Sequence, residues 1–257
     1  MSEGGASGGG DDGGAPAGEA LDLRSYGRRR GRKLSPRQER LMAHLLPTVA
    51  PDLKAPPPST IAELFSAVGD LPTASDAKWA SEGALWLEIG FGGGEHLLWQ
   101  ARNHPHVGII GAEPFEDGVV KVLAVIEDER LDNVLVHADD ARDLLRWLPA
   151  DAVSRAFILF PDPWPKRRHQ KRRLINGQLL ALLARVMRSG AELRIGTDIG
   201  DYARTILMAF QQSPVFIWCA QSPGDWRERP ADWPPTRYEQ KALREGRRCC
   251  YLRFVRR

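Results

Sequence analysis

The sequence predicts an α/β protein with a doubly wound, mostly parallel, seven-stranded sheet whose last strand is antiparallel. From residue 84 onward, short apolar runs rich in Val, Ile, Leu and Phe alternate with amphipathic stretches of helical period. Such alternation is typical of a parallel sheet with helices on both faces. Near the end, two strand-like runs follow each other with no regular helix expected between them, which favours an antiparallel pair. Right-handed crossovers bring the ends of parallel strands to one edge, where ligands bind.

Seven segments have the composition of buried strands, and most stretches between them have helical spacing. We expect the strands at residues 84–89, 107–112, 133–137, 155–160, 191–196, 215–219 and 248–255. Helices are expected near residues 95–102, 116–128, 141–147, 174–188 and 200–211. The stretch between the last two strands is expected to be a long loop, because it contains Trp226, Trp233, Pro234 and Pro235.

Composition divides the 257 residues into three parts. Residues 1–22 are expected to form a disordered tail, because the first 20 residues hold eight glycines and almost nothing apolar. Residues 23–70 are a basic N-terminal extension, with short helices expected near 36–46 and 60–70. Residues 80–257 form the main domain, which is long enough to bury a sizeable core.

Basic residues gather in three blocks, although the net charge is only +3. Residues 24–40 carry eight Lys or Arg, residues 166–173 carry six, and residues 237–257 carry eight. One such block alone is more often a solvated face. Three blocks, two of them beside predicted ligand-binding loops, favour a polyanionic partner such as nucleic acid.

Other features of the composition favour a cytoplasmic protein. Its three cysteines, Cys219, Cys249 and Cys250, have neither the spacing of a metal site nor that of a disulfide framework. No apolar run approaches the roughly 18 residues that cross a bilayer, and the N-terminus lacks the regions of a signal peptide. We therefore expect no metal and no membrane partner. The sequence leaves the oligomeric state open between monomer and homodimer.

A glycine-rich loop follows the first predicted strand. It reads E-x-G-x-G-x-G from Glu88 through Gly90 and Gly92 to Gly94, and such glycines let the backbone turn tightly and approach a ligand closely. Dinucleotide enzymes use a related G-x-G-x-x-G pattern to seat a pyrophosphate. Here Glu95 stands at the third glycine position of that pattern, and its carboxylate would repel a phosphate. The loop therefore favours S-adenosylmethionine, which is cationic and has no phosphate, over NAD.

Acidic residues follow the next two predicted strands. Glu113 ends the second strand, 19 residues after Gly94, where a carboxylate can grip a ribose diol. Asp140 follows the third strand, where it can accept a hydrogen bond from an adenine amino group. Glu88 or Asp140 alone would be interpreted as a helix cap. Acids at three successive strand ends favour a bound adenosyl group.

The fourth predicted strand ends in the turn Pro161-Asp162-Pro163-Trp164. Amino-directed methyltransferases carry a related D/N-P-P-Y/W turn here, in which prolines stiffen the backbone and the aromatic ring stacks on a base. A proline-rich surface loop is the alternative, and the cofactor loop upstream disfavours it. The six cations of residues 166–173 adjoin the turn and can bind phosphates that flank a target nucleotide. The turn is therefore the expected active site, centred on Asp162.

The sequence resembles the tRNA (guanine-N7)-methyltransferase family over most of its length, from about Ser25 to Arg253. Four motifs carry the resemblance, and the second of them is very specific: the cofactor loop from Glu88, the run from Phe160 to Arg173, the pair Thr197-Asp198, and the segment from Thr236 to Glu239. The chain departs from the family at Ile199, where an aromatic residue is common.

The resemblance implies a Rossmann-like class I methyltransferase fold, S-adenosylmethionine as cofactor, and N7 of a guanosine in tRNA as target, usually position 46 of the variable loop. It implies an active-site role for Asp162. It further implies that the cofactor is contacted by Glu88, Gly90, Gly92, Glu113, Asp140 and Asp162. The implied substrate contacts are Lys166, Asp198, Thr236, Arg237, Tyr238 and Glu239.

Guanine N7 has a lone pair in the ring plane and no proton, so we expect in-line methyl transfer without a general base. Asp162 would then orient the base and favour its developing positive charge. One rival is a methyltransferase acting on an exocyclic amino group of adenine or cytosine. Another is an RNA-binding scaffold that keeps the fold without catalysis. A NAD-dependent oxidoreductase comes third, disfavoured by Glu95 and the basic surface.

Overall fold

The computed structural model describes residues 29–66 and 83–257. The Gly-rich tail expected at residues 1–22 lies outside the described residues, as do residues 67–70 of the helix expected at 60–70. Along the described ranges, no helix combines the length and the apolarity needed to cross a bilayer.

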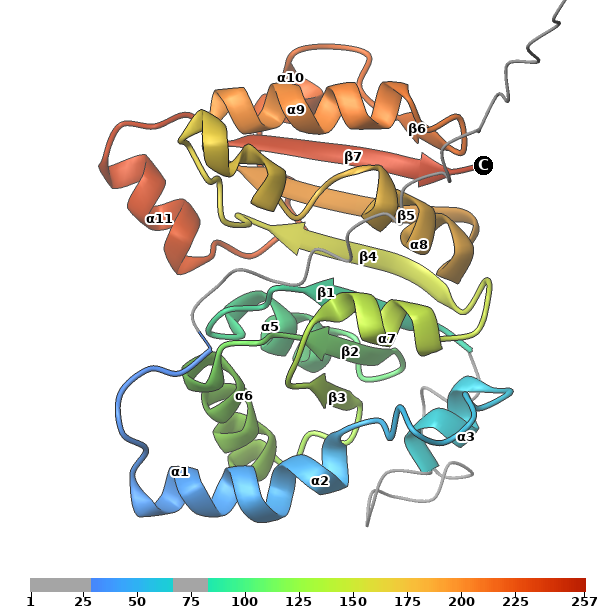
Figure 1. Ribbon diagram of the computed structural model, residues 1–257, viewed down its shortest axis with the longest axis vertical. Coiled ribbons are helices and arrows are strands. Elements are labelled where there is room, and N and C mark those ends of the chain that lie inside the picture. The colour runs from blue at the N-terminus through green and yellow to red at the C-terminus, as the bar shows by residue number, and fades with distance from the viewer. Residues whose placement is uncertain (1–28, 67–82) are drawn as a thin grey trace, which may run out of the picture.

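A seven-stranded sheet runs through the middle of the main domain (Figure 1). Its strand order is β3-β2-β1-β4-β5-β7-β6. Strands β1 to β5 pair in parallel, whereas β7 runs antiparallel to both of its neighbours, β5 and β6. The predicted fold class is confirmed. The strands are β1 (Leu85–Ile89), β2 (Gly108–Ala112), β3 (Val134–His137), β4 (Val153–Leu159), β5 (Met187–Thr197), β6 (Phe216–Trp218) and β7 (Cys250–Arg256).

The strand order reverses beside β1. The chain first runs from β1 to β2 and β3 on one side, and then returns to place β4 on the other side of β1. The carboxyl ends of these two strands are neighbours, since Ile89 of β1 pairs with Ile158 of β4. Open α/β sheets bind ligands at such a reversal, outside the carboxyl ends of the strands. The fold therefore brings the glycine-rich loop and the turn after β4 to one place.

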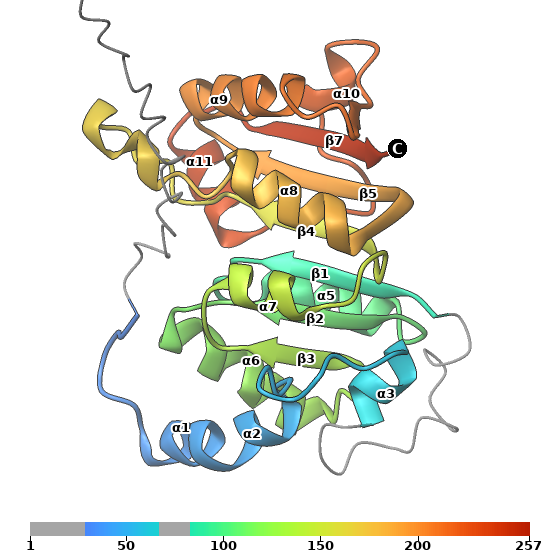
Figure 2. The same ribbon diagram turned by 45° about the vertical axis from the view of Figure 1, so that its right-hand side comes forward.

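Helices cover both faces of the sheet (Figure 2). One hydrophobic cluster joins the sheet to α3, α7, α8 and α9, and a second joins its other face to α5, α6, α11 and the N-terminal helices. The side chains of β1 alternate as a pleated strand requires, with Leu87 in the first cluster and Trp86 in the second. The helices are α3 (Ile61–Ser66), α5 (Glu95–Asn103), α6 (Glu116–Glu129), α7 (Ala141–Trp147), α8 (Gly177–Val186), α9 (Gly200–Gln211), α10 (Gly224–Arg227) and α11 (Arg237–Arg244).

The basic N-terminal extension begins its helical part at Ser35, which caps α1 (Pro36–Arg40) in a capping box with Gln38. A π-helical turn, η1 (Leu41–Leu45), and α2 (Leu46–Val49) continue it. Arg37 and Arg40 form ion pairs with Glu127 of α6, at 3.1 Å and 2.8 Å. Two cations of the basic block at residues 24–40 therefore form contacts within the protein.

Several elements differ from the sequence-based expectation: β5 begins at Met187, within the helix expected at 174–188, and the short helix α10 lies in the expected loop. Helix α8 begins at Gly177 instead of 174, because the Asn176 side chain accepts a hydrogen bond from the backbone N–H of Leu179 and caps the helix there. Helix α11 occupies part of the region expected to be a loop. It was missed because its buried positions include a charged residue, Glu239, and only one small apolar residue, Ala242.

Candidate active site

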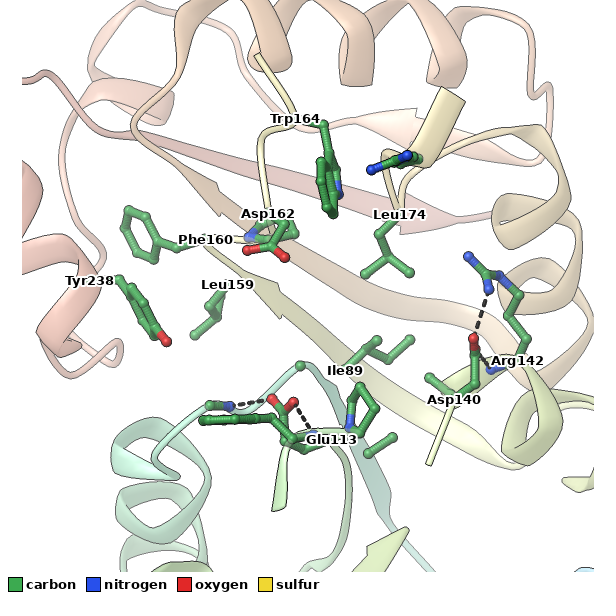
Figure 3. A pocket seen from close by; sticks show the side chains of 18 residues that line it. Ile89, Glu113, Asp140, Arg142, Leu159, Phe160, Asp162, Trp164, Leu174 and Tyr238 are labelled. Carbon is green, nitrogen blue, oxygen red and sulfur yellow. Dashed lines mark hydrogen bonds and ion pairs between the residues drawn. The ribbon is translucent and has the colours of Figure 1, made fainter. Parts of the chain in front are cut away.

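A cavity of about 290 Å³ opens at the carboxyl ends of β1, β2 and β4 (Figure 3). Its walls come from the loops after these strands, the beginnings of α7 and α11, and the segment before α8. It therefore lies where the strand order reverses, the expected ligand position. Its lining residues are Ile89, Gly90, Gly92, Ala112, Glu113, Pro114, Phe115, Asp140, Ala141, Arg142, Leu159, Phe160, Pro161, Asp162, Trp164, Arg172, Leu174 and Tyr238.

The glycine-rich loop forms one wall of the cavity. Gly90, Gly92 and Gly94 have φ angles of 75°, 56° and 81°, in the left-handed region that other residues enter at a cost. A Cβ atom at Gly92 would also lie 3.1 Å from the Tyr238 ring. The alternate glycines of the sequence motif thus match three alternate left-handed residues, and two of them line the cavity.

Glu113 is held at the floor of the cavity by the backbone. Its carboxylate accepts hydrogen bonds from the N–H of Gly92 at 2.8 Å and the N–H of Phe115 at 2.9 Å. Burial raises the pKa of the carboxyl group, and these two hydrogen bonds oppose the rise. Each carboxylate oxygen has two lone pairs, so both can still accept from a ligand hydroxyl.

Asp140 follows β3, lines the cavity and caps α7. One carboxylate oxygen accepts from the Arg142 N–H at 2.9 Å, and the other accepts from the Arg142 guanidinium at 2.8 Å. The two side chains are 5% and 7% exposed, so this is a buried ion pair. The sequence analysis missed Arg142, although a basic residue two positions after a helix cap can fold back onto it. The helix-cap interpretation of Asp140 is therefore correct, and it does not conflict with a position in the cavity.

Glu88 does not line the cavity. Its carboxylate is 2.7 Å from Nδ1 of His96, and the two side chains are only 3% and 1% exposed. The Nε2 atom of His96 is in turn 3.0 Å from the Gln100 amide. Because side chains alternate along β1, Glu88 shares a face with Trp86 and points under α5. The structure thus separates Glu88 from the other predicted cofactor residues.

The turn after β4 is bracketed by two residues with left-handed backbones. Phe160 has φ of 51° and Trp164 has φ of 42°, and such conformations cost roughly 1–3 kcal/mol each in non-glycine residues. The backbone N–H of Phe160 donates to the Gly196 carbonyl at 2.7 Å. Strain of this kind gathers at functional sites, where surrounding contacts maintain it.

Asp162 points its carboxylate into the cavity, across from Glu113 (Figure 3). Desolvation by the surrounding protein raises its pKa. Among the described residues, neither Asp162 nor Glu113 forms an ion pair with a basic side chain. Two uncompensated carboxylates in one cavity favour a cationic ligand, because a nearby positive charge would stabilise both ionised groups.

The basic run after the turn forms a 3₁₀ helix, η2 (Arg167–Arg172). Lys166, Arg167, Arg168 and Lys171 are exposed. The guanidinium of Arg172 lies 5.0 Å from the centre of the Trp164 ring and lines the cavity. The run therefore combines exposed cations with one that contacts the cavity.

The remaining predicted substrate residues fall into two groups. Tyr238 lines the cavity, and Arg237 lies beside the glycine-rich loop with its Nε 2.6 Å from the Glu95 carboxylate. Thr236 and Glu239 are 5% and 1% exposed, respectively, and they begin α11, where the Thr236 hydroxyl accepts from the Glu239 N–H at 3.2 Å.

The Glu239 carboxylate also contacts the Tyr251 hydroxyl and, at 3.2 Å, Arg229. Asp198 is outside the cavity wall and pairs with Arg247 at 2.6 Å. Ile199, the departure from the family pattern, packs against the sheet core. Asp198, Thr236 and Glu239 thus have internal partners, whereas Arg237 and Tyr238 are at the site.

Comparisons with known proteins identify the family. A family model described as a putative methyltransferase matches residues 82–252. The tRNA (guanine-N(7)-)-methyltransferase of Rhodospirillum rubrum is 46% identical over 236 residues, covering 92% of this chain and 89% of its own. That of Hyphomonas neptunium is 48% identical over 221 residues, covering 86% and 94%. The chain belongs to this methyltransferase family.

The solved structure of PH0851 shares the fold, with a TM-score of 0.53 and 12% identity over 70% of this chain and 46% of that chain. The 16S rRNA methyltransferase KamB is similar over 68% of this chain and 88% of its own, with a TM-score of 0.48 and 15% identity.

As a member of this methyltransferase family, the protein is an enzyme that uses S-adenosylmethionine. The cavity fits this cofactor. Its carboxylates suit a cation, its glycine loop admits close approach, and Ile89, Leu159 and Leu174 offer apolar surface. Within the described part of the chain, no group of three or more His, Cys, Asp or Glu is arranged to hold a metal ion.

Proposed function

We propose that this enzyme transfers a methyl group from S-adenosylmethionine to N7 of a guanosine in tRNA, at position 46 of the variable loop. One observation carries the proposal: the catalytic turn, Pro161–Trp164, joins the cavity to a helix of exposed cations. The motif resemblance and the names of the relatives supply the substrate. An enzyme for a small free substrate would have no need of such a cationic approach.

Glu113 and Asp140 are the residues we assign to the adenosyl group. Glu113 stands at the end of β2 with free lone pairs, which suits two ribose hydroxyls. Asp140 stands at the end of β3, which suits a donor on the adenine edge. When bound, S-adenosylmethionine supplies an electrophilic methyl group on a cationic sulfur. We assign Glu88 to an indirect role, since its carboxylate contacts His96 of α5, the helix that follows the glycine-rich loop.

Asp162 and Trp164 are the residues we assign to the target base. The Asp162 carboxylate can accept hydrogen bonds from the guanine N1–H and amino group, while the Trp164 ring offers a face for stacking. N7 carries no proton, so no residue needs to act as a general base. The purine gains positive charge as its bond to carbon forms, and an ionised Asp162 stabilises that charge. It also attracts the cationic cofactor before transfer, so orientation is the larger part of its contribution.

The exposed cations of η2 and Lys166 are the residues we assign to the tRNA backbone. Major-groove edges of base pairs in A-form RNA are out of reach of side chains. A target N7 must therefore be presented in an unstacked nucleotide or an accessible tertiary fold. Phosphate contacts beside the cavity would hold such a nucleotide in register without reading its sequence.

Methylation of an unmodified tRNA transcript tests this function directly. The purified enzyme is incubated with S-adenosylmethionine and a transcript carrying guanosine 46, and the product nucleosides are identified by mass spectrometry. We expect 7-methylguanosine and strand cleavage at that position after borohydride and aniline treatment. A transcript with adenosine 46 is the matched control. A methylated exocyclic amino group on adenine or cytosine would contradict the assignment, and so would unchanged methylation of the control.

A further inference from the structure

We propose that Arg173 is the positioning residue of the catalytic turn: its buried guanidinium holds the Pro163 carbonyl against α9 and thereby fixes where Asp162 stands. This inference rests on the proposed function. It gives Arg173 a role different from that of the five other cations of residues 166–173, although all six stand in the same run of sequence.

Prolines limit how far the catalytic turn can be held by its own backbone. Proline has no N–H, so Pro161, Pro163 and Pro165 donate nothing to the local hydrogen bonds that close ordinary turns. Phe160, just before the turn, and Trp164, its last residue, are in the left-handed region. The N–H of Phe160 fixes the beginning of the turn through the Gly196 carbonyl. Toward the far end of the turn, the Pro163 carbonyl accepts a hydrogen bond from a side chain of another segment.

Arg173 supplies that donor. Its Nε donates to the Pro163 carbonyl at 3.0 Å, Nη1 donates to the Thr205 hydroxyl at 2.5 Å, and Nη2 is 2.5 Å from the Asp201 carboxylate. The guanidinium also lies over the buried Tyr202 ring, 4.8 Å from its centre. Each nitrogen of the planar fork is thus engaged, and three of the four partners belong to α9.

The burial of Arg173 excludes it from phosphate binding. Its side chain is 2% exposed, whereas Arg167 and Arg168, in the helix that ends just before it, are exposed. Gln170 of η2 also donates to Asp201, at 3.3 Å. One point on α9 therefore anchors both the catalytic turn and the basic helix. We infer that this anchor keeps Asp162 at a fixed distance from the phosphate-binding surface.

The variants Arg173→Met and Arg173→Lys test this role in the full-length enzyme. Three quantities are measured for each: kcat at saturating tRNA, the Kd of S-adenosylmethionine, and the dependence of tRNA affinity on salt. We expect Arg173→Met to lower kcat by roughly tenfold to a hundredfold, the loss that a misplaced catalytic group produces. The cofactor Kd and the salt dependence should stay at wild-type values. Lys should restore part of kcat, because an ammonium can reach one of the acceptors but lacks the planar fork.

Arg185→Met is the matched control for a loss of stability. Arg185 also donates to main-chain carbonyls, those of Leu145 and Arg146, but it does so between α7 and α8, away from the cavity. We expect this variant to lower the thermal midpoint without lowering kcat. Thr205→Val leaves the cation in place and removes one acceptor, so it should give a smaller fall in kcat than Arg173→Met. This variant keeps the test available if Arg173→Met does not fold.

Wild-type kcat in Arg173→Met, or in Thr205→Val where only that variant folds, would overturn the inference. A reduced salt dependence of tRNA affinity in Arg173→Met would overturn it as well, since that result belongs to a phosphate contact. If the wild-type enzyme itself fails to methylate tRNA, the proposed function fails instead. The two failures are therefore distinguishable.

Discussion

The two halves of the cavity hold their carboxylates in different ways. In the half that we assign to the cofactor, Glu113 accepts two backbone hydrogen bonds and Asp140 is paired with Arg142. In the half that we assign to the substrate, Asp162 accepts no hydrogen bond from the described residues and stands in a turn with left-handed flanking residues. The first half is built by the protein before any ligand arrives. In the second half, hydrogen bonds hold the backbone of the turn at Phe160 and Pro163. We expect the substrate to supply the hydrogen bonds to the Asp162 carboxylate.

Removing the Asp162 side chain should have the largest effect on activity. We expect Asp162→Ala to lower kcat by roughly 10²–10³-fold, the range for loss of one preorganised electrostatic contact. Asp162→Asn should retain more activity if orientation outweighs charge, because its amide oxygen still accepts a hydrogen bond. Single-turnover kinetics with saturating cofactor and tRNA measure both. Near-normal turnover of Asp162→Asn would contradict a catalytic role for the negative charge of Asp162.

The pH dependence of kcat/KM, which reports groups of the free enzyme, should also depend on Asp162. Burial raises the pKa of Asp162, so activity should decline on acidification at a pH above that of an ordinary aspartate. This limb should vanish in Asp162→Asn and persist in Asp151→Asn, which removes an acid at the opposite edge of the sheet. Because the folded pKa is raised, the ionised group disfavours folding once the pH exceeds the unfolded value. Because Asp162 is exposed, solvent screens this effect, so Asp162→Asn should raise the thermal midpoint at pH 7 only slightly while lowering kcat.

Glu113→Gln should weaken cofactor binding in the half of the cavity that we assign to S-adenosylmethionine. The amide can accept only one of the two backbone hydrogen bonds and presents its NH₂ group to the other donor. A hydrogen bond to a charged group is worth about 1.5–3 kcal/mol, so the Kd of S-adenosylmethionine should rise by roughly tenfold to a hundredfold. Isothermal titration calorimetry measures it. Glu116→Gln, three residues later and outside the cavity wall, should leave Kd unchanged.

The exposed cations should give a moderate effect on affinity alone. Replacing Arg167 or Arg168 with Gln should weaken tRNA binding and reduce the slope of log affinity against log salt by about 0.7–0.9 per charge. Filter binding across a salt series measures both quantities. Arg188→Gln removes an equally exposed cation at the start of β5 and should leave the slope unchanged. Equal slopes for all three variants would contradict a phosphate role for η2.

Glu127→Gln should have the smallest effect and none on catalysis. Arg40 and Arg37 lower the pKa of Glu127 to about 2, so the ion pairs stabilise the fold fully above its ordinary value near 4.5 and are lost as pH falls toward 2. We expect a slightly lower thermal midpoint than wild type at pH 7. The difference should shrink with added salt, because the pairs are exposed. Scanning calorimetry at two salt concentrations checks this.

The sequence predicted the sheet and most helices because their buried faces follow simple periods of 2 and 3.6 residues. It also located the cavity, since the glycine loop, Glu113, Asp140 and the catalytic turn are all at strand ends. It did not separate Glu88 from this group. The sequence shows where β1 ends, but it does not show toward which face of the sheet the Glu88 side chain points. In the structure, Glu88 points toward the buried imidazole of His96.

The substrate half was harder to predict for a related reason. In the motif from Thr236 to Glu239, the first and last residues are buried at the start of α11, whereas Arg237 and Tyr238 lie at the site. The sequence alone does not distinguish a threonine that caps a helix from one that binds a substrate. Arg173 was likewise hidden among cations of identical type. Its burial follows from the position of α9, which the local sequence does not encode. The roles assigned to these residues stay predictions.

The direction of β7 has one more consequence. Because this strand runs opposite to β6, the end of β6 and the start of β7 open on the same edge as the cavity, with Cys250 beside Thr197. The intervening segment, which contains α11, leaves and returns at one side of the sheet. It therefore brings Tyr238 to the cavity wall from the same side of the sheet on which the glycine-rich loop lies. The same segment places Trp233 and Ala242 in the second hydrophobic cluster, so a single connection both completes the cavity wall and closes the core beneath it.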